Sequence, residues 1–242
     1  MTRRLGLLVA AAALLLASQS AGAARTTVSG LSEPEAIVGG SATASGSAYT
    51  FTSLLSGKPV RWNPCRPIHW VFRPYGAPSG ALPVVQSAVA RIARATGTTW
   101  VYDGQVLSAP SSRWLPSSSA QVRPLLIGWT DAAHSDLLRG RPSTVLGVTR
   151  TAWFGTVQNG VTTAAIQAAV VALDRTDRLP LTGTASWRTV LLHELGHAMG
   201  LGHAGSSAQV MYPTLQRRFT DLQPGDLTGL SRVGRAAGCI NL

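Results

Sequence analysis

The sequence predicts an α+β fold in one domain with short extensions. Short runs of β-branched and aromatic residues between polar turns predict strands, and two stretches carry an apolar stripe at helical spacing. A third stretch places two histidines four residues apart, which also fits a helix. With 242 residues, 45% of them apolar, the chain can form one domain core, and it contains no internal repeat.

The first residues have the pattern of an export signal. A charged start precedes the apolar run Leu5–Ala17, which is too short to span a bilayer, and Ala21–Ala23 fits an A-x-A cleavage site. We therefore expect a signal peptide over 1–23 and a secreted, extracellular protein without a membrane anchor. Residues 24–48 are rich in Ser, Gly, Ala and Thr and are expected to form a flexible arm or short propeptide. The folded domain is expected over 49–242.

Strands and one helix are predicted for the first part of this domain. The stretch Leu82–Thr96 fits a helix, because Pro83 suits a first turn and Gly97 suits a helix end. Strands are expected over Ile68–Phe72, Thr99–Tyr102, Leu125–Trp129, Val145–Thr151 and Ala165–Leu173, although the alanine content of the last also suits a helix.

Two more helices are predicted after these strands. One is expected over Trp187–Met199, with Ser186 as its N-cap. The other is expected over Pro224–Ala237, where Leu227 and Leu230 begin an apolar stripe.

The most informative stretch is HELGHAMGLGH at residues 193–203, which has the spacing H-E-x-x-H-x-x-G-x-x-H. On a helix, His193 and His197 lie on one face and can bind one ion, while Glu194 flanks that ion. A helix end at Gly200 would let the chain turn and bring back His203 as a third nitrogen ligand. Three imidazoles with an open fourth position are typical of catalytic rather than structural zinc.

Together with the downstream stretch Val210–Pro213, this motif resembles the metzincin metalloproteases, and most closely the matrixins. The resemblance implies a zincin domain with a twisted mixed sheet, an N-terminal helix, an active-site helix, a C-terminal helix and a Met-turn that places Met211 beneath the zinc. It extends from about Tyr49 to the C-terminus. Ala204 stands where matrixins usually have Ser. No prodomain latch and no clear calcium site are visible, so Ca²⁺ remains possible without a supporting site.

The residues and the resemblance together predict a zinc-dependent endopeptidase acting on proteins or peptides. A water in the open zinc position would lose its proton to Glu194 and attack the scissile carbonyl. The substrate would pair with an edge strand, for which Val145–Thr151 is the candidate. Leu215 and Phe219 are expected to wall the specificity pocket.

Two other function classes remain open. One is a non-catalytic, zinc-stabilised binding module, which would more typically have lost Glu194. The other is an electrostatic binder of anionic polymers, because the net charge is +11. The arginines are scattered, however, with only pairs such as Arg217–Arg218, and this pattern argues against specific nucleic-acid binding. We expect a monomer.

Two cysteines, Cys65 and Cys239, lie near the two ends of the predicted domain. In an exported protein such a pair favours a disulfide, and a zinc-binding thiolate latch at Cys65 is the alternative.

Two groups of acidic residues, one of them with a histidine, need a separate interpretation. The cluster Asp131, His134 and Asp136 is interpreted as a solvated loop rather than a second metal site, because too few ligands are visible. Asp174 and Asp177 fit turn chemistry, with calcium ligation as the alternative.

Overall fold

The computed structural model describes residues 26–39, 46–119, 121 and 123–241. The predicted signal peptide over 1–23 lies outside this part. Among the described residues, no helix has both the length and the apolar character needed to cross a bilayer.

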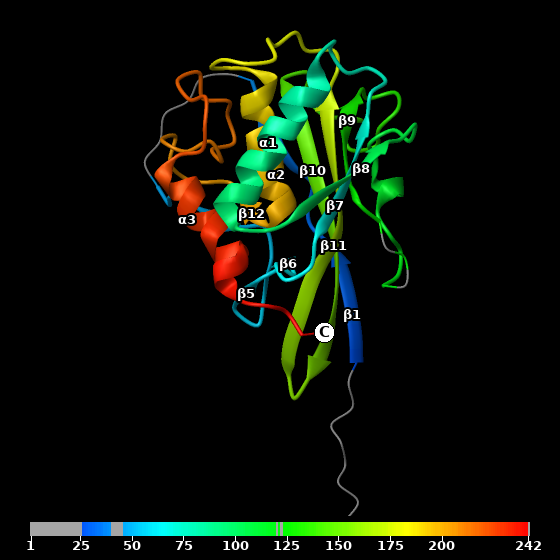
Figure 1. Cartoon of the computed structure of the whole chain (residues 1–242), viewed down its shortest axis with the longest axis vertical. Coiled ribbons are helices and arrows are strands. Elements are labelled where there is room, and N and C mark those ends of the chain that lie inside the picture. Colours follow the sequence, from blue (N-terminus) through cyan, green and yellow to red (C-terminus); the bar gives the residue numbers. More distant parts are fainter. Residues whose placement is uncertain (1–25, 40–45, 120, 122, 242) are drawn as a thin grey trace, which may run out of the picture.

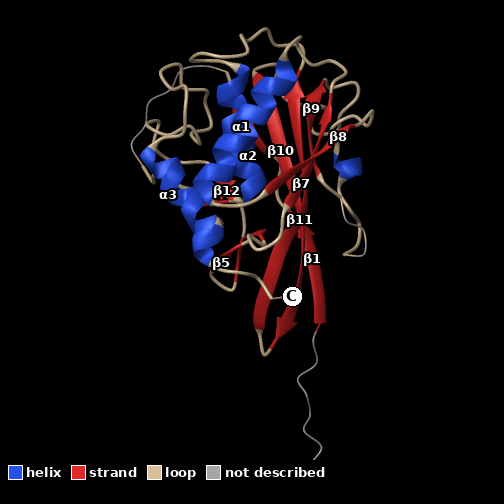
Figure 2. Ribbon diagram, viewed as in Figure 1, coloured by secondary structure: helices blue, strands red, loops and turns tan. Residues whose placement is uncertain are grey.

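The centre of the structure is a mixed sheet in the order β1-β10-β11-β9-β7-β8, with β2 paired to β10 and β6 paired to β11 (Figures 1 and 2). Strands β1, β2 and β11 run antiparallel to β10, whereas β9 pairs parallel with both β11 and β7. The strands are β1 (Thr26–Leu31), β2 (Glu35–Val38), β6 (Arg61–Trp62), β7 (Ile68–Arg73), β8 (Trp100–Gln105), β9 (Leu125–Thr130), β10 (Val145–Gln158) and β11 (Val161–Asp174).

Within the described part of the chain, three α-helices accompany this sheet, as the sequence predicted: α1 (Ala81–Thr96), α2 (Trp187–Met199) and α3 (Pro224–Val233). Helix α3 ends four residues before the predicted Ala237, because the chain leaves helical geometry at Gly234 and forms a 3₁₀ turn, η2 (Arg235–Ala237). The α+β fold class is confirmed. Four short strands form two small pairs: β3 (Thr50–Phe51) with β12 (Leu201–Gly202), and β4 (Leu54–Leu55) with β5 (Lys58–Pro59).

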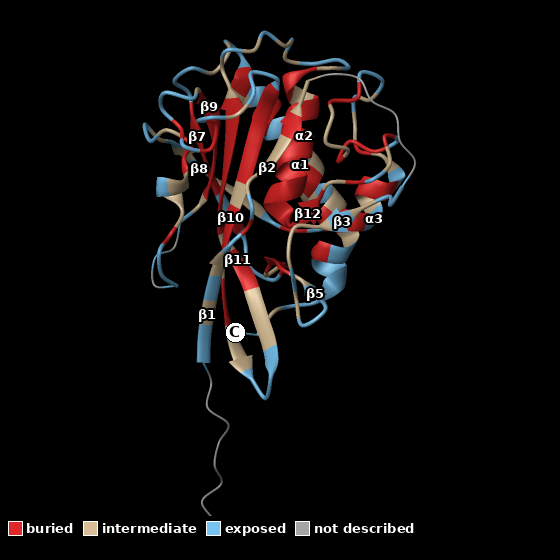
Figure 3. Cartoon of the chain, turned by 180° about the vertical axis from the view of Figure 1, so that it is seen from behind, coloured by how far each residue is buried: buried red, intermediate tan, exposed pale blue. Residues whose placement is uncertain are grey.

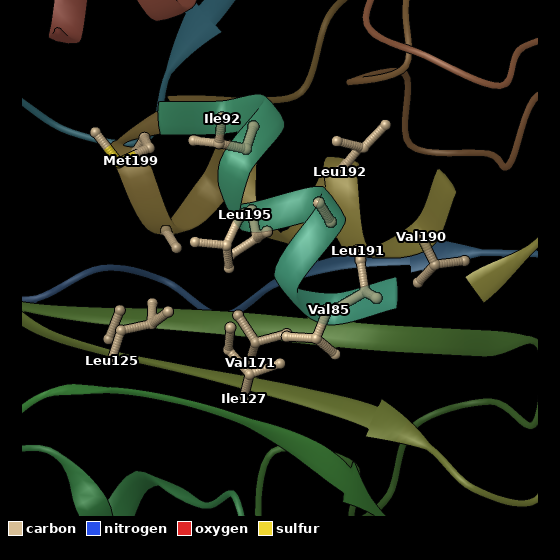
Figure 4. Close-up of a cluster of buried hydrophobic side chains, with 14 of the residues drawn as sticks. Val85, Ile92, Leu125, Ile127, Val171, Val190, Leu191, Leu192, Leu195 and Met199 are labelled. Carbon is tan, nitrogen blue, oxygen red and sulfur yellow. The ribbon is translucent and has the colours of Figure 1, made fainter. Parts of the chain in front are cut away.

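The main core lies between the sheet and the helices α1 and α2 (Figure 4). Ile127 and Val171 from the sheet are fully buried together with Val85 and Ile92 of α1 and Leu195 of α2. Helix α2 is buried over nearly its whole length, so the histidines it carries are fixed by packing on all sides.

The structure joins Cys65 and Cys239 in a disulfide. Cys65 therefore offers no free thiolate, and the latch alternative does not apply to this state. The bond connects the segment before β7 to the C-terminal tail across 174 residues.

The N-terminal arm differs from the prediction. Within the stretch predicted as flexible, residues 26–31 and 35–38 form β1 and β2, both paired with β10 (Figure 3). These strands could hardly be recognised in the sequence, because strand addition depends mainly on main-chain hydrogen bonds and needs little apolar pattern.

The stretch Val145–Thr151, expected to be the edge strand that pairs with substrate, does not lie at the edge of the sheet in this structure. This stretch forms the first half of β10, which pairs with β11 on one side and with β1 and β2 on the other. Only residues 26–38 cover the second side among the described strands.

Candidate metal centre

Helix α2 places the first two histidines of the motif. Ser186 caps its first turn by accepting a hydrogen bond from the Thr189 amide, and Gly200 ends it with a positive φ of 106°. A side chain at Gly200 would also collide with the Val60 carbonyl, 2.4 Å from the ideal Cβ position. After this turn β12 pairs with β3 and leads the chain back to His203.

The three histidines meet at one point, with ligand atoms within 4.8 Å of one another. Each Nδ1 atom faces an acceptor: His193 faces the Val210 carbonyl at 2.7 Å, and His197 faces the Leu201 carbonyl at 2.7 Å. The Nδ1 of His203 lies 3.2 Å from the carboxylate Oε2 of Glu35.

These contacts determine what can bind in the space between the three imidazole rings. A nitrogen that faces a carbonyl or carboxylate carries the proton, so each Nε2 keeps a bare lone pair. The Nε2 atoms of His193 and His197 lie only 2.9 Å apart, and the buried Nε2 of His203 has no hydrogen-bond partner among the described residues. Lone pairs directed at one another repel, and a cation between them removes the repulsion. The residues therefore fit a divalent ion such as zinc.

Burial keeps these ligands neutral. It lowers the pKa of His193 to about 3, and it lowers the pKa of His197 well below its usual value. Both rings are almost fully buried. Because an imidazole binds metal in its neutral form, the site is ready for an ion at neutral pH.

Glu194 is the buried carboxylate beside the histidines, with no exposed surface. Burial raises its pKa to about 8, although a 2.6 Å hydrogen bond donated by the Thr149 hydroxyl to Oε2 opposes this. Its other oxygen, Oε1, has no hydrogen-bond partner in the described part of the chain. The ideal Cβ position at Gly147 lies 2.9 Å from Oε1, so this strand residue has to be small.

Met211 lies under the helix that carries the histidines. It is fully buried, and the ideal Cβ position at Gly196 lies only 2.3 Å from its sulfur. The buried carboxylate of Asp226 accepts hydrogen bonds from the amides of Val210 and Met211 at 2.9 and 3.1 Å. Since Val210 in turn accepts from His193, Asp226 of α3 holds the turn that orients a metal ligand.

Sequence reasoning did not find Thr149, Asp226 or Glu35. Thr149 is one polar residue in a buried strand and meets Glu194 across 45 positions. Asp226 has a local signal, because it is the N3 partner of Gln223 in a capping box, but nothing in that pattern points to the metal site. Glu35 lies in the arm that was predicted to be flexible.

Of the two residues predicted to wall the specificity pocket, one lines a cavity and the other does not. Leu215 is buried and lines a cavity together with Leu146 and Gly39, whereas Phe219 is partly buried against the main core and does not line that cavity.

Three of the other acidic residues have ordinary partners, whereas the buried Oδ2 of Asp177 has no hydrogen-bond partner among the described residues. The Asp131 carboxylate contacts the imidazole ring of His134 and the guanidinium of Arg175. The Asp136 carboxylate accepts a hydrogen bond from the Ser112 amide. Asp174 forms the predicted turn contact by accepting from Thr176.

Comparison with known proteins gives concordant matches. Residues 98–233, more than half of the chain, match the model of the family described as Matrixin. The chain is 36% identical over 63 residues to Metalloendoproteinase 2-MMP of Arabidopsis thaliana and 31% identical over 65 residues to Metalloendoproteinase 1 of Glycine max. These stretches cover 25% and 26% of this chain and only 17% and 21% of the two relatives.

Proposed function

Since this chain belongs to the matrixin family, we propose that it is a secreted zinc endopeptidase that hydrolyses internal bonds of proteins or peptides. The observation that carries the proposal is the convergence of three bare Nε2 atoms beside a buried carboxylate. The pattern of residues 1–23 and the pairing of both cysteines support export.

His193, His197 and His203 would hold the zinc, and Met211 would lie beneath them as an apolar floor. Bound there, zinc supplies a Lewis acid that polarises a carbonyl and favours the loss of a proton from water. Glu194 accepts that proton at Oε1, the oxygen that Thr149 does not occupy, and later delivers it to the leaving nitrogen.

The edge of β10 would align the substrate. Its main-chain groups next to the site pair with an extended segment, as β2 shows, and such pairing fixes a peptide bond relative to Glu194. A substrate can use this edge only when residues 35–38 have left it.

The experiment compares the chain with Glu194→Gln for cleavage of an unfolded protein, with the zinc content of each measured. We expect the variant to retain one zinc per chain and to lose about 10²–10⁴ in rate, since that is the usual contribution of a general base. Glu33→Gln is the matched control, because it makes the same chemical change at an exposed residue outside the site. Equal cleavage by Glu194→Gln and the parent chain would exclude this role of Glu194.

A further inference from the structure

Residues 35–38 lie in the cleft as an extended peptide held on both sides. On one side β2 pairs antiparallel with β10, so that Ile37 lies opposite Gly147. On the other side the Val38 amide donates to the Pro213 carbonyl at 3.0 Å, and the Leu215 amide donates to the Val38 carbonyl at 2.9 Å. The arm thus connects β10 to the segment after Met211.

The register places one peptide bond of the arm beside the site. Gly147, which lies opposite Ile37, is the residue whose Cβ would meet Glu194. Glu35, two residues before Ile37, contacts the His203 ring, and Ile37 itself lies at the strand position beside Glu194. The chain therefore runs from the metal ligand His203 toward the general base Glu194, so the Ala36 end of the Ala36–Ile37 bond lies on the His203 side and the Ile37 end lies on the Glu194 side.

This direction of the chain relative to the site is the one that hydrolysis needs. The carbonyl oxygen must lie toward the Lewis acid, and the leaving nitrogen must lie within reach of the group that returns the proton. A peptide bound in the opposite direction would exchange the two ends of the bond.

The flanking side chains also anchor this bond. Ile37 is fully buried and belongs to the main core together with Leu146 and Leu215, so its side chain fills an apolar pocket next to the site. Glu35 contacts Nδ1 of His203 rather than Nε2. Its carboxylate therefore orients the ring and leaves the metal-facing nitrogen free.

We propose that Ala36–Ile37 is a substrate bond of the chain itself, held in place by β2 and cut by the same molecule when zinc is bound. The inference rests on the proposed endopeptidase function. A water oxygen bonds to the Ala36 carbonyl carbon and the bond to the Ile37 nitrogen breaks. One water proton passes through Glu194 to that nitrogen, and the second leaves the new carboxyl group and protonates the amine, so that the products are a carboxylate at Ala36 and an ammonium terminus at Ile37.

The experiment starts from the full, metal-free chain in chelator and adds Zn²⁺. Intact mass and N-terminal sequencing follow the arm, and an unfolded protein in a parallel tube reports general cleavage. We expect a new terminus at Ile37, formed at a rate that does not change over a tenfold range of chain concentration. A rate proportional to concentration, or a cut at another bond of the arm, overturns the proposal.

Three variants test whether the Ile37 side chain holds the Ala36–Ile37 bond at the site. Ile37→Leu keeps an aliphatic side chain and should still be cut, whereas Ile37→Asp places a charge in the pocket and should not be cut at this bond. Leu31→Asp makes the same kind of change at a side chain that is 45% exposed and should leave the cut unchanged.

A readout independent of cleavage uses zinc-loaded Glu194→Gln, which keeps the arm intact. Hydrogen exchange should find the Val38 and Leu215 amides protected, because both donate across the cleft. Adding Ile37→Asp to this variant should remove the protection. Rapid exchange at both amides in Glu194→Gln alone would show that the arm does not occupy the cleft, and the proposal would be wrong.

The outcomes separate the inference from the proposed function. If the parent chain cuts the unfolded protein while Ala36–Ile37 stays intact, the inference fails and the endopeptidase proposal stands. The same holds if only Ile37→Asp cuts the unfolded protein, since the arm then blocks the cleft without being cut. If no variant cuts anything, the endopeptidase proposal fails, and the inference fails with it.

Discussion

Gly196→Ala tests the contact between the active-site helix and Met211. The ideal Cβ position lies 2.3 Å from the Met211 sulfur and 3.0 Å from its methyl carbon. Favourable contacts between such atoms require roughly 3.5–4.0 Å, so the thioether has to move by more than about 1 Å. Met211 is fully buried, and its amide is held by Asp226, so little space is available for that movement.

Two effects oppose each other at this position. Replacing Gly by Ala inside a helix stabilises by about 1 kcal/mol. Overpacking a buried site costs about 1–3 kcal/mol, and the depth of this overlap places the cost in the upper half of that range. We therefore expect a net loss of about 1–2 kcal/mol in unfolding free energy, and weaker zinc binding, because His197 is the next residue.

The assay is urea unfolding of the metal-free chain, in which zinc binding does not contribute to the free energy, followed by a zinc titration. Met211→Ala alone should cost about 2–5 kcal/mol by opening a cavity. The double variant should cost clearly less than the sum, because the new methyl group of residue 196 enters that cavity. The reasoning is refuted if Gly196→Ala stabilises the protein by about 1 kcal/mol, as at an uncrowded helical position, or if the two changes add.

Three further outcomes are expected. Thr149→Val should lower the cleavage rate about tenfold without changing the zinc content, because Glu194 loses the hydrogen bond that orients it, and equal rates would exclude that role. Replacing both Cys65 and Cys239 by Ser should lower the unfolding free energy by about 3–5 kcal/mol, since the bond closes a loop across 174 residues, and an unchanged urea midpoint would contradict this. The Asp131 carboxylate is destabilised by burial, but hydrogen bonds and charge from its histidine and arginine partners outweigh burial and lower its pKa to about 2. A depressed pKa stabilises the fold above the unfolded value of about 4 and ceases to do so as the pH falls toward 2, so Asp131→Asn should cost about 1–2 kcal/mol at pH 6 and little at pH 2, as urea midpoints at the two pH values can show.

Features encoded by local spacing were predictable from the sequence. The i, i+4 histidines and the caps Ser186 and Gly200 define α2 within one continuous stretch. The pairing of Cys65 with Cys239 followed from the presence of only two cysteines.

Features that depend on contacts between distant segments were not predictable in this way. Thr149 reaches Glu194 across 45 positions, and no local pattern distinguishes it from other threonines in strands. Residues 26–38 carry little apolar pattern, because their pairing with β10 uses main-chain groups. The sequence thus indicated which residues bind metal, but not which groups orient them or what lies across the cleft.

Strands β1 and β2 also affect the solubility of the protein. They cover one side of β10, a strand of 14 residues whose side chains are mostly buried. A long uncovered edge of this kind is a template for pairing between molecules, and natural proteins protect such edges against aggregation. Uncovering the cleft completely would therefore also expose an aggregation-prone edge. A cut after Ala36 breaks the covalent link between β1 and the rest of the chain. Strand β1 remains paired with β10 over six residues, so most of that edge can stay covered while the cleft opens.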